Sequence, residues 1–131
     1  MAGTDKLPPF YLQEITNNLH SGEVHKATSQ VKEALSHYPS DRNLLIIAND
    51  VFRACNDLDA ALWSAKELIE HHPSYFDGYC RAAQELNKMN RLIEAVDLIS
   101  VGLDKFPEDL WTLYTAMTIH LDDKNYQVAC E

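Results

Sequence analysis

The chain contains 131 residues, of which 46% are hydrophobic and 24% are charged, with only 4 Gly and 5 Pro. This composition is typical of a folded domain and excludes fibrous and low-complexity chains, and the length provides for one modest core. The net charge of −9 argues against binding to nucleic acid, because phosphate contacts need clustered Lys and Arg side chains. We therefore expect a protein or peptide partner that is neutral or basic.

A fixed period organises the chain. Pro39, Pro73 and Pro107 follow one another at intervals of 34 residues, and four alanines repeat at the same interval. These alanines are Ala27, Ala61, Ala95 and Ala129. A period of this size indicates an array in which a small unit stacks on copies of itself. We predict an N-terminal extension over 1–7 and a single domain over 8–131, with units 8–41, 42–75 and 76–109 and a partial unit 110–131.

Each unit is predicted to contain two antiparallel helices. Apolar residues recur at steps of three and four within a unit, as in Leu45, Ala48 and Phe52. Short polar segments separate the two helices of a unit, and the last such segment is Asp123-Lys124-Asn125. The prolines end the second helix of each pair, because proline cannot continue a helix. The predicted helices are 9–21, 24–37, 42–55, 58–71, 76–88, 92–105 and 109–122, with a further helix starting at 125.

This combination of period and pattern resembles the tetratricopeptide repeat (TPR) family, in about three and a half repeats over residues 8–131. The family pattern is carried by Tyr79, Ala82, Leu86, Ala95 and Pro107 in the third unit, and by Leu45, Ala48, Phe52, Ala61 and Pro73 in the second. The resemblance implies an all-α solenoid of antiparallel helix pairs that form a right-handed superhelix. Asn49 and Ala83 stand where the family usually has glycine, so we expect slightly wider local packing. A related helical-hairpin repeat of similar length is the alternative.

Proteins that resemble this family bind partner segments along a concave face, which is lined by the first helix of each unit. The sequence projected onto that face predicts the partner-binding residues Asn43, Ile46, Asp50, Arg53, Asp77, Arg81, Gln84, Lys88, Trp111 and Tyr114. This mixture of polar groups and apolar anchors suits a groove for an extended or helical peptide. The alternative is that these residues form only the solvated side of short helices. For Arg81, an ion pair with Asp77 one helical turn away is the simpler role.

Some TPR proteins grip the C-terminal carboxylate of a chaperone with Lys, Asn and Arg side chains from three units. The corresponding positions here hold Leu12, Thr16, Ile47, Asp77 and Arg81. Only Arg81 matches the family pattern. We therefore expect that this chain does not bind chaperone tails in that manner.

The sequence offers no catalytic or metal-binding motif. The histidines are scattered or adjacent, as His71 and His72 are, and lack the four-residue steps that bring metal ligands together on a helix. There is no glycine-rich phosphate loop, and no base is identifiable beside a cysteine. We predict a non-enzymatic scaffold or adaptor that needs neither a cofactor nor a metal.

The cysteines and the N-terminal residues indicate the cellular compartment in which we expect the protein. Cys55, Cys80 and Cys130 are not closely spaced and fall in predicted helices, so we expect buried or half-buried reduced thiols. Residues 1–14 lack the apolar stretch of a secretory signal, and no apolar run is long enough to cross a bilayer. These features favour a cytoplasmic protein without membrane contact.

Two other functions are compatible with the period. The first is that the chain is the accessory region of a longer enzyme, such as a glycan- or sulfate-modifying transferase. The incomplete fourth unit motivates this hypothesis. The second is that the chain is a self-associating subunit, which forms a homodimer through the incomplete C-terminal unit.

Overall fold

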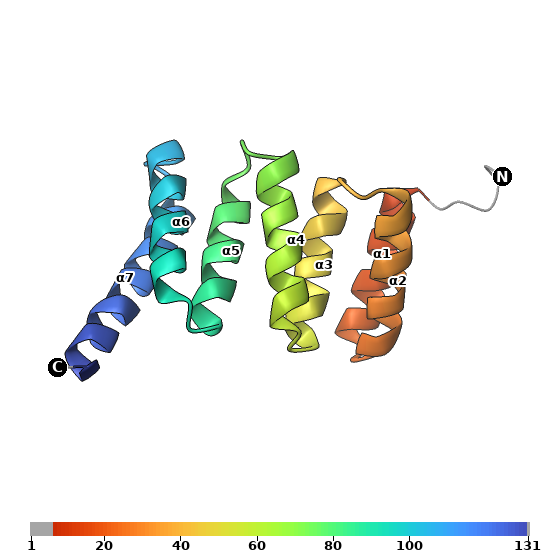
Figure 1. Cartoon of the computed structure of the whole chain (residues 1–131). Coiled ribbons are helices and arrows are strands. Elements are labelled where there is room, and N and C mark those ends of the chain that lie inside the picture. Colours follow the sequence, from red (N-terminus) through yellow and green to blue (C-terminus); the bar gives the residue numbers. More distant parts are fainter. Residues whose placement is uncertain (1–6, 131) are drawn as a thin grey trace.

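The computed structural model describes residues 7–130, without the side chains of 125–130. The described chain is all α-helical and forms a solenoid of two layers (Figure 1). Helices α1, α3, α5 and α7 form one layer, and α2, α4 and α6 form the other. The helices are α1 (Pro8–His20), α2 (Val24–His37), α3 (Arg42–Ala54), α4 (Leu58–His71), α5 (Phe76–Lys88), α6 (Leu92–Lys105) and α7 (Leu110–Cys130). The predicted bounds of α2, α4, α5 and α6 are confirmed, and α1 and α3 each end one residue earlier than predicted.

The turns inside the first three units each contain one residue with a positive φ angle. Gly22, Asn56 and Asn90 have φ angles of 82°, 58° and 61°, and they stand 34 residues apart. Glycine and asparagine are the residues that tolerate this left-handed region best. The turn therefore depends on a residue that tolerates a positive φ, glycine or asparagine, at one position of the period.

The predicted break at 123–125 is wrong, because α7 continues through it to Cys130. The fourth position of the turn series is Lys124, where the earlier units have Gly22, Asn56 and Asn90. A lysine in the left-handed region costs about 1–2 kcal/mol, whereas it is a good residue inside a helix. The helix therefore runs on where the other units turn.

The prolines end the second helix of each pair as predicted. The residues Tyr38, His72 and Phe106 precede the prolines and have ψ angles of 68°, 63° and 62°, outside the helical range. Asp41 then accepts a hydrogen bond from the Leu44 amide at 3.0 Å, which stabilises the start of α3. Asp109 does the same for α7 through the Thr112 amide, at 2.8 Å.

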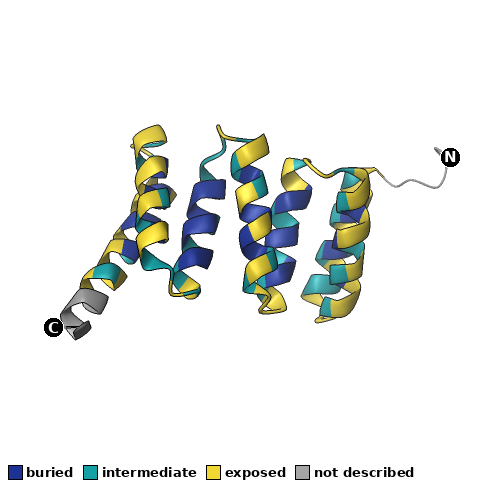
Figure 2. Cartoon of the chain, in the orientation of Figure 1, coloured by how far each residue is buried: buried dark blue, intermediate teal, exposed yellow. Residues whose placement is uncertain are grey.

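The core lies between the two layers, and Figure 2 shows the exposed residues along the outward sides of α4 and α6. Ala27, Ala61 and Ala95 are fully buried, as expected of small residues where the helices of a pair come close; the side chain of Ala129 lies outside the described residues. Gly102 allows a further close approach, since a Cβ atom there would lie 3.1 Å from Tyr79 Cβ.

The thiols differ from the prediction in one respect. Cys80 is buried, but Cys55 is exposed, because it caps the end of α3 and leads into the turn. Both are free, and Cys130 has no described side chain. None of the described helices combines the length and the apolar character needed to cross a membrane.

Candidate functional site

The predicted partner-binding residues lie on α3, α5 and α7, which belong to the same layer. Asn43, Lys88, Trp111 and Tyr114 are exposed. The others are half-buried, namely Ile46, Asp50, Arg53, Asp77, Arg81 and Gln84. The half-buried residues are concentrated where α3 faces α5.

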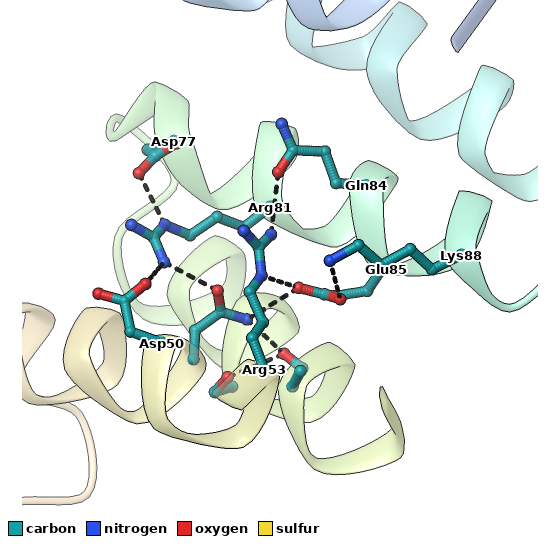
Figure 3. Close-up of polar contacts among 10 residues, drawn as sticks. Asp50, Arg53, Asp77, Arg81, Gln84, Glu85 and Lys88 are labelled. Atoms are coloured by element: carbon teal, nitrogen blue, oxygen red, sulfur yellow. Dashed lines mark hydrogen bonds and ion pairs between the residues drawn. The ribbon is translucent and has the colours of Figure 1, made fainter. Parts of the chain in front are cut away.

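The spacing between α3 and α5 differs from that of the other neighbours in this layer. Helix α1 packs against α3 and α5 packs against α7 with Cα atoms within 8 Å, whereas no Cα atom of α3 comes this close to α5. Both helices are described in full. Long polar side chains bridge the space instead, and we call them the α3–α5 network (Figure 3). The network consists of Asn49, Asp50, Arg53, Asp77, Arg81, Gln84, Glu85 and Lys88.

Arg81 is the centre of one half of the network. Its Nε atom donates to Asp77 at 2.7 Å, as the sequence predicted, and one terminal nitrogen donates to Asp50 and to the Asn49 side chain, each at 2.8 Å. Burial by itself lowers the pKa of Arg81, but the hydrogen bonds that it donates to Asp77 and Asp50, together with their negative charges, outweigh burial, so the pKa is raised. Arg81 is thus a permanent cation whose described bonds hold it to α3.

Glu85 is the centre of the other half. Its side chain is fully buried and accepts hydrogen bonds from Arg53 Nε and, at 3.4 Å, from Asn49 Nδ2. Arg53 also donates to Gln84 Oε1 at 2.9 Å. The second carboxylate oxygen, Oε1, accepts no hydrogen bond within the described residues, and Lys88 Nζ lies 4.0 Å from it. A buried carboxylate is costly unless it is paired, so Arg53 and Glu85 depend on each other.

Glu85 and Asn49 belong to the network but are not among the predicted partner-binding residues. Glu85 stands at the same place in the period as Val51 and Ile119, which are both buried. A charged residue at a position that is apolar in the neighbouring units was therefore a signal of a buried polar contact. Asn49 donates to the Ala61 carbonyl oxygen at 2.8 Å, so it connects α3 to α4 as well as to α5.

A cavity of about 250 Å³ opens beside the network. Five of the predicted residues line it together with Phe76; they are Arg53, Asp77, Arg81, Gln84 and Trp111. The Trp111 ring stacks on Tyr114, with the ring centres 5.5 Å apart. The remaining predicted residues do not line this cavity, namely Asn43, Ile46, Asp50, Lys88 and Tyr114. The cavity therefore combines two cations, a carboxylate, an amide and two aromatic rings.

A larger cavity, of about 630 Å³, lies near the turn between α5 and α6 and contains none of the predicted residues. Asn87, Asn90 and Asp123 contribute to its walls. Its strongest polar groups bind each other, since Arg91 donates two hydrogen bonds to Glu94, at 2.8 and 2.7 Å. The cavity beside the network is thus the better candidate, although it is smaller.

Two chemical features of the described residues bear on the kind of site. Burial raises the pKa of the Cys80 thiol, which keeps it protonated and unreactive at neutral pH. Among the described residues, no group of three His, Cys, Asp or Glu side chains is arranged to hold a metal ion. The cavity offers hydrogen bonds, charge and aromatic surface.

Comparisons with known proteins agree with the fold. No protein-family model and no curated protein matches the sequence. Among solved structures, the TPR domain of Sgt2 from Aspergillus fumigatus superposes with a TM-score of 0.81 at 16% identity, over 95% of this chain and 85% of that one. The second TPR domain of human RPAP3, in complex with the HSP70 peptide SGPTIEEVD, has a TM-score of 0.73 at 13% identity, over 84% and 92% of the two chains.

A third similar structure is the type III secretion translocator chaperone SycD from Yersinia enterocolitica, with a TM-score of 0.75 at 15% identity, over 88% of this chain and 92% of that one. The seven helices correspond to about three and a half TPR units. The predicted all-α solenoid and the resemblance to TPR domains are confirmed at the level of the fold.

Proposed function

We propose that this chain is a non-enzymatic interaction scaffold that holds a segment of a partner protein against the layer formed by α3, α5 and α7. The observation that carries the proposal is the cavity in which Arg53, Gln84 and Trp111 meet. Side chains of this kind, and Trp and Arg above all, supply most of the binding energy at protein interfaces.

The comparisons support a peptide as the ligand class. A structure with this fold, the second TPR domain of RPAP3, is a complex with a peptide. The cavity here lies on the layer that contains the first helix of each unit, which is where the resemblance predicts the binding face. A peptide segment is thus the ligand that fits both the fold and the residues.

The charges of the site and of the whole chain indicate which kind of peptide would bind. Arg81 already binds Asp77, Asp50 and Asn49, so a carboxylate ligand would compete with these bonds. The chain as a whole carries a net charge of −9, which repels acidic segments and attracts basic ones over several ångströms. We propose a neutral or basic segment with an aromatic or aliphatic side chain that packs on Trp111.

Selection from a peptide library displayed on phage tests this function, followed by titration of the selected peptides by fluorescence polarisation. The variant Trp111→Ala should weaken binding at least about tenfold, because it removes the aromatic anchor. Trp63→Ala is the matched control, since Trp63 is exposed to a similar degree (47%, against 44% for Trp111) but lies on α4 in the other layer. The peptide SGPTIEEVD should not bind measurably.

If no peptide is selected, or if Trp111→Ala and Trp63→Ala have equal effects, the proposed site is wrong. We also place the scaffold in a reducing compartment, the cytoplasm, because Cys55 is a free thiol at the surface. The division into units 8–41, 42–75, 76–109 and 110–131 belongs to the same proposal.

A further inference from the structure

Helix α7 presents a row of apolar side chains to solvent. Leu110, Met117 and Leu121 are 81%, 69% and 58% exposed, which is unusual for large apolar residues in one helix. Leu113 and Tyr114 lie between them and are also exposed. We call these five residues the α7 stripe.

The stripe lies on the side of α7 that faces away from the core. Successive residues of a helix are 100° apart, so the five residues share one side, and the buried residues share the opposite one. The buried residues are Thr112, Thr115, Ala116 and Ile119. Leu113 and Met117 stand one period after Tyr79 and Ala83, which are buried in the third unit. No described helix covers the equivalent side of α7.

The charge distribution on α7 favours a particular occupant. Residues 110–119 contain no charged side chain, in a chain that carries a net charge of −9. Two copies of the chain repel each other through their net charge, but contact between residues 110–121 of two copies places no acidic side chain opposite another. Self-association through the stripe itself therefore brings no like charges into contact.

We propose that the α7 stripe binds the α7 stripe of a second copy, antiparallel and related by a two-fold axis. The pattern of the stripe is nearly unchanged when the helix is reversed, because Leu110 then lies opposite Leu121 and Tyr114 lies opposite Met117. In a two-fold interface each such contact occurs twice.

The expected affinity is modest. The five side chains expose on the order of 600 Å² per copy, which is near the lower limit for a specific interface. We therefore expect a dissociation constant on the order of 10 µM. Antiparallel pairing of α7 also reproduces the antiparallel packing that α5 makes with α6 in the preceding unit.

Sedimentation equilibrium of the 131-residue chain, from about 1 to 200 µM, tests the proposal. The chain should pass from monomer to dimer over this range. Met117→Glu should weaken dimerisation at least about 30-fold, because it buries two charges at the centre of the interface. Ile93→Glu is the control, since Ile93 is 78% exposed on α6 and should leave dimerisation unchanged. Circular dichroism should show equal helix content in all variants.

A charge-pair experiment tests the antiparallel orientation. Leu110→Glu and Leu121→Lys should each weaken the dimer about tenfold, whereas the double variant should recover it, because each Glu then faces a Lys of the other copy. A chain that stays monomeric at 200 µM overturns the proposal, as does a dimer that Met117→Glu leaves intact. A double variant that dimerises no better than the single variants overturns the antiparallel pairing.

Discussion

The side of α3 that faces α5 and the outer side of α7 hold equivalent positions of the repeat but differ in chemistry; Arg53 and Leu121, for example, stand two periods apart. Between α3 and α5, charged side chains enter the interior and bind one another, as Arg53 binds Glu85. On α7, apolar side chains such as Met117 stand in solvent. The period thus specifies where the helices lie, while single residues decide whether a helix surface finds its contacts within the chain or stays exposed.

The two surfaces also differ in what they contribute to stability. A buried ion pair is often no more stabilising than apolar residues of the same size, but breaking it is expensive. We infer that the α3–α5 network aligns the second and third units, because its bonds join residues 31 to 36 positions apart. The α7 stripe contributes little to the monomer.

The largest expected effect comes from breaking the α3–α5 network on one side. Arg53→Met should lower the free energy of unfolding by about 3 kcal/mol, because Glu85 is then buried without its main partner. Lys88 Nζ lies 4.0 Å from Glu85 Oε1, beyond hydrogen-bond distance, and so does not replace the Arg53 Nε donor. Urea denaturation followed by circular dichroism measures the change.

The double variant Arg53→Met/Glu85→Leu is the control for this experiment. It removes both charges and fills similar volumes, so it should recover most of the lost stability. Equal losses in the single and double variants would contradict the view that the pair is coupled.

A smaller change in the free energy of unfolding should distinguish a buried residue inside a unit from an exposed residue of the α7 stripe. Ala61→Leu should cost about 1–3 kcal/mol, because Ala61 is fully buried and its carbonyl oxygen accepts a hydrogen bond from Asn49. Met117→Ala should stay within about 0.5 kcal/mol when unfolding is measured below about 1 µM protein, where a dimer does not contribute. A similar cost for the two variants would show that α7 is covered in the monomer.

A substitution near the end of α7 should change global stability least, because its effect is confined to the residues around it. Lys124→Gly should favour a turn at 124, because glycine enters the left-handed region without penalty and lowers helix propensity by about 1 kcal/mol. Amide hydrogen exchange should become faster on both sides of residue 124, while the unfolding of the rest of the chain stays the same. Lys124→Ala keeps the helix and serves as the control. Unchanged exchange in Lys124→Gly would show that the residue at 124 does not decide the end of the helix.

Most of the fold was predictable because it follows from local rules repeated at a fixed interval. Prolines end helices and small residues mark close crossings, and Pro73 and Ala61 do so here as the period predicts. Polarity alone does not predict the end of α7, because the polar segment Asp123-Lys124-Asn125 lies inside the helix. A residue that tolerates a positive φ, such as Asn56 or Asn90, predicts the turn better. Lys124 stands at the equivalent position and does not tolerate that backbone conformation well.

The candidate site was predictable only in part. The helix face that carries Arg53, Arg81 and Trp111 follows from helical spacing, and the Arg81–Asp77 pair follows from an interval of one turn. The pairing of Arg53 with Glu85 does not, because it joins two units and depends on the wide spacing of α3 and α5. Local periodicity contains no information about such distant partners.

The division of the core has a consequence for folding. One apolar cluster contains residues from α1 to α3 and ends at Ala61 in the first turns of α4, and the other begins at the next residue, Leu62, and extends to Ile119 in α7. In stacked repeats each unit gains stability mainly from its neighbours, and α4 contributes residues to both clusters. Destabilising α4 should therefore weaken both halves of the chain at once, whereas a change in α1 or α7 should weaken mainly the half that contains it.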